Sequence, residues 1–503
     1  MGRVVVRLLS DVAATERLAE DVAAVLMPGD LVALSGDLGA GKSTFARALL
    51  RAVAGDPDLE VPSPTFALRI DYALPRLSVV HADLYRLGRQ ADLGELGLED
   101  ALDSGALLVE WPGLLPADIA GSRLDIAMTI EGAGRHAEIS ASGDFAARLD
   151  RTLAVRDFLD GAGRRLALRR PIAGDASGRA YERIISGTES AILMNAPRRP
   201  DGPPVRDGRS YDSLALRALD VRPFVAVGTA LRAKGVHAPE MHAVDLDAGL
   251  LLLEDLGGET ILAADGTADP ERYGAAADLI AFVHMQDWQT DLKLPDGTSW
   301  RVPPYDREAL LAETDLFSTW FAGNGGEPAF PEEKKEPFRE AWSRMLDRVG
   351  PETTLALRDY HSPNIMWLPH AKGLDRIGVI DFQDAAMGHP AYDLASLGQD
   401  ARVDVPETLE RDLIDRYLGA RRHGSPGFDA AAFEAAYAIF AAQRATKILG
   451  IFTRLALAEG KTTYQRHRNR LKRLLARTLH HEVLSDMRVW YEPFLGTDGV
   501  GAG

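Results

Sequence analysis

The feature that most restricts the fold of this chain is a glycine-rich turn between an apolar run and an amphipathic segment. Residues 30–34 (DLVAL) predict a short buried strand, residues 36–43 read GDLGAGKS, and residues 43–54 predict a helix. A G-x-x-x-x-G-K-S segment between a strand and a helix is typical of a phosphate-binding loop. Its glycines let successive backbone amides turn toward a phosphate, and the helix N-terminus adds partial positive charge. The sequence therefore predicts a nucleoside triphosphate site.

Each position of this loop has an expected role. Lys42 is predicted to reach the β- and γ-phosphates, and the Ser43 hydroxyl to bind Mg²⁺. The alternative is an ordinary glycine-rich turn, but the flanking strand and helix favour the nucleotide site. We therefore predict ATP and Mg²⁺ as cofactors. The predicted nucleotide contacts are Gly36, Asp37, Leu38, Gly39, Ala40, Gly41, Lys42, Ser43 and Thr44.

ATP hydrolysis also needs a further ligand on the metal side and a group that orients water. Thr65 stands in a proline-flanked segment and offers a hydroxyl for a metal contact. Asp83 comes just past a predicted strand at residues 77–81, and Glu110 ends an apolar predicted strand at residues 106–110. Taken singly, each has a structural alternative, namely a turn for Thr65 and a solvated strand end for the carboxylates.

Strand-like and helix-like segments alternate around these positions. Residues 4–8, 123–130 and 136–140 predict further strands, and residues 11–26 predict a helix. Such alternation favours an α/β sheet. At about 150 residues per domain, a chain of 503 residues should form about three folding units.

Composition excludes several classes of protein. Lys and Arg total 57 and Asp and Glu total 74, so the net charge is −17, which argues against a nucleic-acid binder that relies on a basic surface. The chain has 0 Cys, which excludes disulfides, thiolate metal sites and cysteine nucleophiles. No apolar run reaches the ~18 residues of a membrane span, and acidic residues interrupt the start of the chain. We expect a cytoplasmic protein without a membrane partner.

Together and in this order, the N-terminal motifs resemble the TsaE-type ATPases of bacterial tRNA threonylcarbamoyladenosine synthesis. The resemblance covers residues 3 to about 143, and its motifs are the loop 36–43, Ser63–Phe66, His81–Arg86, Glu110–Pro112 and Gly134–Arg135. It implies a P-loop ATPase that acts with the partner proteins of the threonylcarbamoyl-transfer complex, which modifies adenosine 37 of certain tRNAs. It also implies that Thr65 handles phosphate and Mg²⁺, and that Asp83 and Glu110 are the catalytic and metal-side carboxylates. Contact with tRNA is expected to be indirect at most.

A second set of polar residues follows two apolar runs near residue 360. The segment Arg358–Asn364 reads RDYHSPN and comes after a predicted strand at residues 354–357, and Asp381 comes after a predicted strand at residues 377–380. Phosphoryl transfer to a hydroxyl needs a carboxylate for the acceptor's proton and oxygen ligands for Mg²⁺. We predict Asp359 for the first role and Asn364 with Asp381 for the second. Two unrelated polar turns are the alternative.

Two segments upstream complete a kinase-like pattern. Residues 174–183 predict a loop over the phosphates, with nucleotide contacts from Ser177, Arg179 and Arg183. Residues 250–257 predict a strand that runs into a hinge, where Glu254, Asp255 and Leu256 would meet the adenine. A buried strand with a solvated end is an equal alternative for this second segment.

Residues 165–495 resemble the aminoglycoside phosphotransferase superfamily and, more narrowly, its AmgK-type kinases. The narrower motifs are Gly174–Arg183, Leu193–Pro197, Pro303–Arg307, Asp381–Ala385, Tyr392–Leu397 and Gln443–Arg454. The resemblance implies a bilobal protein-kinase-like fold with a largely helical C-lobe. It implies phosphorylation of N-acetylmuramate and N-acetylglucosamine at the anomeric hydroxyl, in cell-wall recycling. Tyr305, Asp306 and Asp384 are the predicted sugar contacts, with loop packing as the alternative for Tyr305 and Asp306.

One departure from the kinase pattern leaves alternatives open. The strand predicted at residues 190–195 holds Met194 and no lysine for the phosphates, so we expect Arg179 or Arg183 to supply that charge. An aminoglycoside or choline-type kinase shares the same catalytic residues. A non-catalytic nucleotide-binding scaffold is a further alternative.

The predicted layout has five parts. Residues 1–145 form the P-loop ATPase domain, 146–164 a linker helix, 165–257 the kinase N-lobe, 258–495 the helical C-lobe and 496–503 a disordered tail. Within the N-lobe, residues 180–185 and 190–194 predict strands and residues 197–209 a loop. The overall fold class is α/β, a P-loop sheet domain followed by the bilobal kinase-like domain.

Overall fold

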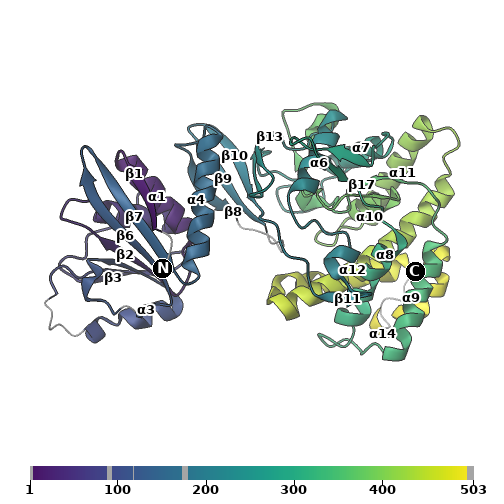
Figure 1. Ribbon diagram of the computed structural model, residues 1–503. Coiled ribbons are helices and arrows are strands. Elements are labelled where there is room, and N and C mark those ends of the chain that lie inside the picture. The colour runs from purple at the N-terminus through teal and green to yellow at the C-terminus, as the bar shows by residue number, and fades with distance from the viewer. Residues whose placement is uncertain (1–3, 88–92, 117, 173–178, 496–503) are drawn as a thin grey trace. The chain divides into compact units, whose positions relative to one another are not determined.

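The computed structural model describes residues 4–87, 93–116, 118–172 and 179–495 (Figure 1). The chain forms two compact units. Among the described residues, the first unit holds 4–172 and 180–195, and the second holds 179 and 196–495. The tail predicted at residues 496–503 and the predicted nucleotide contact Ser177 lie outside the described residues.

The first unit contains a seven-stranded sheet of order β1-β7-β6-β2-β5-β4-β3. Its strands are β1 (Val4–Leu9), β2 (Asp30–Ser35), β3 (Arg69–Tyr72), β4 (Val79–Asp83), β5 (Ala106–Glu110), β6 (Ser122–Glu131) and β7 (Gly134–Ser142). Strands β2, β4, β5 and β6 are parallel, so their carboxyl ends meet at one edge of the sheet. Glu110 pairs in register with both Leu34 and Asp83 at this edge. The predicted α/β sheet is confirmed.

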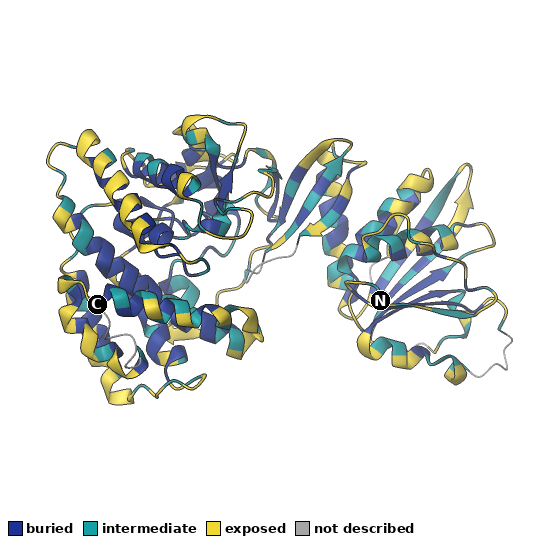
Figure 2. Cartoon of the chain, turned by 180° about the vertical axis from the view of Figure 1, so that it is seen from behind, coloured by how far each residue is buried: buried dark blue, intermediate teal, exposed yellow. Residues whose placement is uncertain are grey.

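Helices cover both faces of this sheet. Alternate residues of β2 point to opposite faces, and the apolar residues on each face pack in a separate core. The helices are α1 (Val12–Val25), α2 (Lys42–Ala54), α3 (Leu98–Ser104) and α4 (Phe145–Gly161), with short 3₁₀ turns at Leu93–Leu96 and Pro112–Leu114. Val32 and Leu34 pack in a core with α1 and α2. Leu31 and Ala33 pack in a separate core that includes Leu98 of α3. The buried and exposed stripes of these elements are visible in Figure 2.

A three-stranded antiparallel segment follows α4 in the first unit. It consists of β8 (Leu168–Ile172), β9 (Ala180–Ser186) and β10 (Glu189–Asn195). Buried Asp21 of α1 accepts from Arg156 of α4 at 2.9 Å and from Arg169 of β8 at 2.7 Å. The helix predicted as a linker therefore packs against α1 through a buried ion network. The proposed division at residues 145 and 164 stays a prediction.

The second unit contains short strands along its length and two helices near its start. Its strands are β11 (Pro204–Arg206), β12 (Arg209–Ser210), β13 (Met241–Asp245), β14 (Leu250–Glu254), β15 (Asp291–Lys293), β16 (Ser299–Arg301), β17 (Thr354–Ala356), β18 (Ile365–Trp367), β19 (Ile377–Val379) and β20 (Ala386–Gly388). Helices α5 (Tyr211–Leu214) and α6 (Arg222–Ala233) precede β13. The strands predicted within residues 250–257, 354–357 and 377–380 are confirmed as β14, β17 and β19, each of which ends before the predicted range does.

The prediction of a loop over residues 197–209 is partly wrong, because β11 and β12 form a hairpin there. Asp207 and Gly208 occupy its turn with φ of 49° and 73°. An Asp-Gly pair favours this left-handed turn, which matches the twist of the flanking strands. The many polar and proline residues nearby hid the hairpin from pattern analysis.

Helices make up most of the rest of the second unit, as predicted. They are α7 (Pro270–His284), α8 (Arg307–Leu316), α9 (Glu332–Leu346), α10 (Ala391–Gly398), α11 (Glu407–Gly424), α12 (Ala430–Glu459), α13 (Arg468–Thr478) and α14 (Arg488–Leu495), with a π-helical turn at Phe317–Phe321 and 3₁₀ turns at Ser362–Asn364, Gly373–Arg376, Thr462–His467 and Glu482–Met487. The buried helix α12 packs against α8, α10 and α13. A Cβ at Gly450 would lie 2.5 Å from Leu316, so this glycine allows α12 to approach closely.

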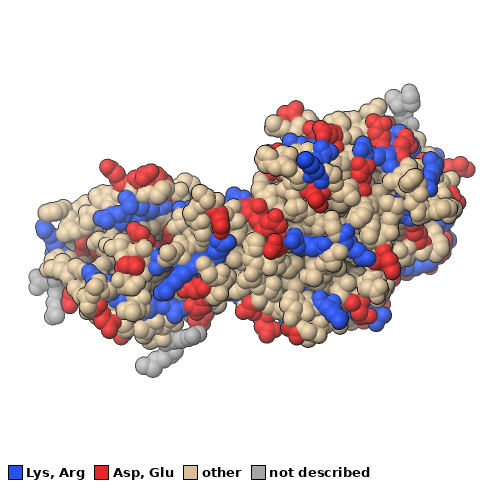
Figure 3. Space-filling model, turned by 90° about the horizontal axis from the view of Figure 1, so that it is seen from above, with Lys and Arg blue, Asp and Glu red and all other residues tan. Residues whose placement is uncertain are grey.

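Charged side chains of both signs are interspersed on the face of the molecule shown in Figure 3. The basic run at residues 466–473 follows this pattern, because Arg470 pairs with Asp404 at 2.6 Å and Lys472 with Glu327 at 3.0 Å. Among the described helices, none combines the length and apolar character that a membrane crossing needs.

Candidate active sites

The predicted phosphate-binding loop leaves the sheet directly after β2. Gly36, Gly39 and Gly41 have φ of 131°, 80° and 108°, a backbone region that favours glycine. A Cβ at Gly36 would lie only 2.1 Å from the Met128 carbonyl oxygen, so no other residue fits this position. Helix α2 begins at Lys42, which places its N-terminus beside the loop. The loop therefore has the geometry that exposes backbone amides to a phosphate.

The Lys42 side chain folds back over this loop. Its Nζ donates to the carbonyl oxygens of Gly36 at 2.7 Å and Asp37 at 2.9 Å. The ammonium also lies 4.0 Å from the centre of the Trp111 ring. Burial lowers the pKa of Lys42, and the carboxylates of Glu110 and Asp83 oppose that shift. The cation is thus held inside the loop, where it can exchange the two carbonyls for phosphate oxygens.

Polar side chains at the carboxyl ends of β4 and β5 face the start of α2. The Ser43 hydroxyl donates to Glu110 Oε2 at 2.9 Å, and Glu110 Oε1 lies 3.2 Å from Nε2 of buried His81. The Thr65 hydroxyl donates to Asp83 Oδ2 at 2.9 Å. Hydroxyl and carboxylate oxygens are the ligands that Mg²⁺ prefers, together with phosphate oxygens. The structure therefore brings Ser43 and Glu110 together in a set that fits the metal, with Asp83 at the end of the neighbouring strand β4 and Thr65 hydrogen-bonded to it.

Three residues around this loop were not predicted as site residues, namely His81, Trp111 and Arg135. Arg135 of β7 donates to the carbonyl oxygens of Ala40 and Gly39, each at 3.1 Å, and so braces the loop. Trp111 adopts a left-handed φ of 61°, which turns the chain directly after Glu110. Each stands in or beside a motif visible in the sequence. The contacts that each of these residues makes, however, depend on the order of strands in the sheet, which the motifs do not reveal.

In the second unit, the RDYHSPN segment follows β17 as predicted. Arg358 has a left-handed φ of 67°. Buried Asp393 of α10 accepts from the backbone amides of Leu357 at 2.7 Å and Arg358 at 2.8 Å. Two charge-assisted hydrogen bonds hold this turn and thereby fix the direction of the next residue, Asp359.

Asp359 and the two predicted metal ligands, Asn364 and Asp381, lie together. Asn364 Nδ2 donates to the Asp359 carbonyl oxygen at 3.0 Å and lies 3.5 Å from Asp381 Oδ2. Gln383 Nε2 and Arg179 Nη1 donate to Asp381 Oδ1 at 2.9 and 3.3 Å. Burial and the neighbouring Asp359 carboxylate raise the pKa of Asp381, as expected where carboxylates await a cation. The side-chain oxygens of Asn364 and Asp381 are of the kind that Mg²⁺ prefers.

A buried network of charges surrounds Asp359. Glu313 of α8 is fully buried and accepts from Lys447 at 2.7 Å and Arg358 at 2.8 Å. Burial alone would raise the pKa of Asp359, but the charges of Lys447, His361, Arg217 and Arg358 outweigh it and lower this pKa to about 2. Asp359 is therefore ionised at neutral pH and can accept a hydrogen bond from an acceptor hydroxyl.

Lys447 is a positioning residue, because its charge acts on Asp359 and stabilises the ionised form of this carboxyl. Lys447→Met removes the largest cationic contribution at Asp359, so the pKa of this carboxyl should rise. The acidic limb of the pH profile of kcat/KM for phosphoryl transfer should then move to higher pH. Lys447→Arg keeps the charge and should restore most of the wild-type profile. Lys372→Met, an exposed control, should leave it unchanged. A loss of activity without a shift of the profile would contradict this role.

The predicted sugar contacts are engaged by other groups of the second unit. Tyr305 is buried, and its hydroxyl donates to Glu313 at 2.6 Å. Asp306 caps α8 by accepting from the Ala309 amide at 3.0 Å. Asp384 is buried and accepts from the Ala218 amide at 2.8 Å. Each thus has a partner in the protein, and a contact with sugar stays a prediction.

The predicted nucleotide contacts before Asp359 fall in several places. Glu254 ends β14 and accepts from the Glu240 amide at 3.0 Å, while Asp255 accepts from the Gly257 amide at 3.0 Å. Leu256 packs against Gly378, where an added Cβ would lie 2.8 Å from its side chain. Arg183 of β9 lies opposite Ile192 of β10. The adenine and phosphate contacts assigned to these residues stay predictions.

Comparison with known proteins gives two matches along the chain. The family model "Threonylcarbamoyl adenosine biosynthesis protein TsaE" matches residues 9–137, and the model "Phosphotransferase enzyme family" matches residues 169–433. Each match contains one of the two constellations described above.

Individual relatives follow the same division. An N-acetylmuramate/N-acetylglucosamine kinase of Caulobacter vibrioides is 36% identical over 333 residues, which cover 64% of this chain and 90% of that protein. A tRNA threonylcarbamoyladenosine biosynthesis protein TsaE of Rickettsia bellii is 40% identical over 101 residues, or 20% of this chain and 69% of that protein. A microcompartment-associated aminopropanol kinase of known structure shares 17% identity, covers 68% of this chain and 98% of its own, and has a TM-score of 0.44.

Proposed function

Because the chain belongs to the phosphotransferase enzyme family in its C-terminal part and to the TsaE family in its N-terminal part, we propose that it is a bifunctional enzyme. The first unit is a Mg²⁺-dependent ATPase that supports threonylcarbamoylation of adenosine 37 in tRNA. The second is an ATP-dependent kinase for the anomeric hydroxyl of N-acetylmuramate and N-acetylglucosamine. Both activities belong to the cytoplasm, and neither needs a membrane partner.

In the first unit, the loop amides and Lys42 bind the phosphates of ATP, and Ser43 with Glu110 holds the magnesium side. Mg²⁺ would neutralise charge that develops on the phosphate oxygens. Thr65 joins the magnesium side, and Asp83, which accepts from the Thr65 hydroxyl at 2.9 Å, is the catalytic carboxylate that orients the attacking water. ATP hydrolysis by itself changes no tRNA base. It therefore acts by driving a conformational change in the partner proteins of the threonylcarbamoyl-transfer complex. Contact with tRNA is at most indirect, which agrees with the net charge of −17.

In the second unit, Asn364 and Asp381 hold the magnesium side of ATP, and Asp359 receives the acceptor hydroxyl. The anomeric oxygen forms a bond to the γ-phosphorus while the bond from this phosphorus to the bridging β–γ oxygen breaks. ADP leaves with the electron pair of that bond, and the hydroxyl proton passes through Asp359 to solvent. Arg179 adds positive charge at Asp381 in the place of the absent strand lysine.

The observation that carries the kinase proposal is the convergence of Asp359, Asn364 and Asp381, joined by hydrogen bonds through Asn364. The 36% identity to an amino-sugar kinase favours the acceptor class. Aminoglycosides and choline are the alternative acceptors.

A panel of acceptors with labelled ATP tests this proposal. The full chain with MgATP should phosphorylate N-acetylmuramate and N-acetylglucosamine, and the product should lose its reducing end, because the anomeric oxygen carries the phosphate. Kanamycin and choline should give no labelled product. Turnover of choline or kanamycin alone would contradict the assignment to amino sugars, and hydrolysis of ATP without transfer to any acceptor would contradict a kinase.

A further inference from the structure

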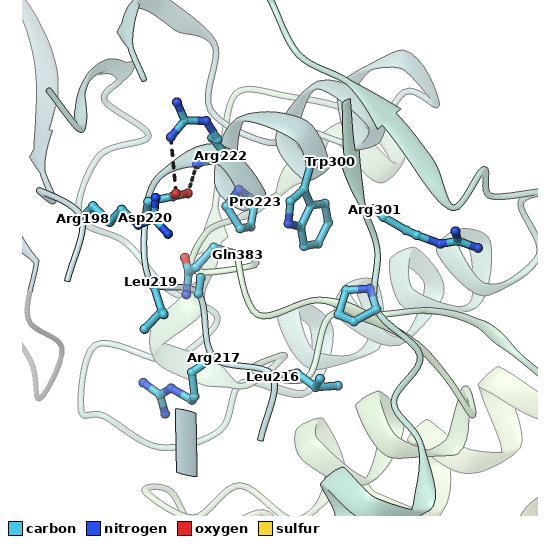
Figure 4. A pocket seen from close by; sticks show the side chains of 12 residues that line it. Arg198, Leu216, Arg217, Leu219, Asp220, Arg222, Pro223, Trp300, Arg301 and Gln383 are labelled. Carbon is cyan, nitrogen blue, oxygen red and sulfur yellow. Dashed lines mark hydrogen bonds and ion pairs between the residues drawn. The ribbon is translucent and has the colours of Figure 1, made fainter. Parts of the chain in front are cut away.

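A cavity of about 300 Å³ opens in the second unit beside the catalytic residues. Its walls include Leu216 and Arg217 from the segment before α6, Pro223 of α6, Trp300 of β16 and Gln383. Figure 4 shows the side chains of Trp300, Pro223 and Gln383 around one space. This volume lies at the lower end of the range of small-molecule sites and suits a single monosaccharide.

Three contacts connect the wall of the cavity to residues in or next to the catalytic set. Gln383 donates to Asp381 at 2.9 Å. Leu216 accepts from Arg358, the residue before Asp359, at 3.3 Å. Arg217 forms an ion pair with Asp384 at 3.3 Å. A molecule in this cavity would therefore touch Gln383, which contacts Asp381, and Leu216, which contacts the residue before Asp359.

The apolar and amide groups of the wall fit an N-acetyl amino sugar. The rings of Trp300 and Pro223 offer flat apolar surfaces for the C–H face of a pyranose ring. Gln383 is 3% exposed, and its Oε1 has no hydrogen-bond partner among the described residues. A buried carbonyl oxygen without a hydrogen-bond partner raises the free energy of the folded protein. A ligand N–H or hydroxyl that donates to it would therefore bind more tightly.

The charge of the wall is mainly positive. Arg198, Arg217, Arg222 and Arg301 line it with a single carboxylate, Asp220. Arg222 pairs with that carboxylate at 3.3 Å, and Arg301 extends away from Gln383 in Figure 4. Arg198 has no ion-pair partner within the part of the chain that the structure describes. Arg217 uses Nε for Asp384, whereas a guanidinium binds carboxylates through its Nη groups as well.

We propose that this cavity is the acceptor site of the kinase and that Arg198 and Arg217 bind the carboxylate of the acidic amino sugar. The proposal rests on the proposed function, because N-acetylmuramate differs from N-acetylglucosamine only by a lactyl ether that carries this carboxylate. Trp300 and Gln383 contact the part that both sugars share. The two arginines therefore set the preference between the two acceptors.

Steady-state kinetics of Arg198→Gln and Arg217→Gln with both sugars test the proposal. The ratio of KM for N-acetylmuramate to KM for N-acetylglucosamine should rise by about 10-fold in each variant, since a hydrogen bond to a charged group is lost for one sugar only. Trp300→Ala should raise KM for both sugars together. The exposed control Arg344→Gln, on α9, should change neither KM.

The outcomes separate this proposal from the proposed function. If both sugars are phosphorylated but the ratio stays within about 2-fold of the wild type in both arginine variants, the carboxylate site is wrong and the kinase assignment stands. A rise of KM for ATP, equal with the two sugars, would show that the arginines bind the nucleotide phosphates and would overturn the proposal. If neither sugar is phosphorylated by the wild type, the proposed function itself fails.

Discussion

Asp359→Asn should lower kcat of the sugar kinase by about 10²- to 10⁴-fold, the contribution typical of a positioned acid or base. The substitution keeps the size and hydrogen-bonding shape of the side chain but removes the charge that receives the acceptor proton. Asn364 and Asp381 remain in place, so the affinity for MgATP should change little. The measurement is labelled phosphate transfer to N-acetylglucosamine, with nucleotide binding followed in parallel.

Two comparisons make this result specific to the site. Asp412→Asn, on the exposed face of α11, should keep wild-type kcat. The first unit does not use Asp359, so its ATP hydrolysis should also be retained in the Asp359→Asn chain. If that chain phosphorylates the sugar at more than about half of the wild-type rate, Asp359 does not have the assigned role.

Lys42→Ala should lower ATP hydrolysis by the first unit by about 10²- to 10³-fold, as for loss of a group that stabilises developing charge. Lys42 is the cation held inside the phosphate-binding loop by Gly36 and Asp37. Hydrolysis is measured in the absence of amino sugar and in the presence of the threonylcarbamoyl-transfer partners. Formation of threonylcarbamoyladenosine in tRNA gives a second readout and should fall in parallel.

The control for Lys42 is Arg47→Ala, an exposed position on the same helix α2, which should hydrolyse ATP normally. Sugar phosphorylation by the Lys42→Ala chain should match the wild type, because the second unit binds its own nucleotide. Retained hydrolysis in the Lys42→Ala chain would place the ATPase activity elsewhere. A wild-type chain that hydrolyses ATP normally, but neither binds the partner proteins nor supports tRNA modification, would instead contradict the assignment to this pathway.

Much of the fold could be predicted because the relevant information is local. The apolar run 30–34, the glycine pattern of 36–43 and the helical spacing of 43–54 define a strand, a loop and a helix by themselves. The apolar strand before Glu110 placed this carboxylate at a strand end, and parallel pairing then brought it to Ser43. In the same way, the order of Asp359, Asn364 and Asp381 along the chain was sufficient to predict that these residues lie close together.

The parts that could not be predicted depend on contacts between distant segments. Lys447 reaches Glu313 and influences Asp359 only because α12 packs against α8. Arg135 meets Gly39 across the sheet, 96 residues away in the chain. Trp300 and Arg217 share a cavity wall although no motif connects them. Residues such as Tyr305 and Asp306 carry suitable groups for a sugar, but the sequence could not reveal that Glu313 and the start of α8 already engage them.

Each unit should bind its own magnesium-bound triphosphate. Titration calorimetry of the full chain with a non-hydrolysable ATP analogue and Mg²⁺ measures this directly. We expect two moles of nucleotide per mole of chain for the wild type. Each of the single variants, Lys42→Ala and Asp381→Asn, should bind one mole. Binding of a single mole to the wild type at saturation would contradict the account.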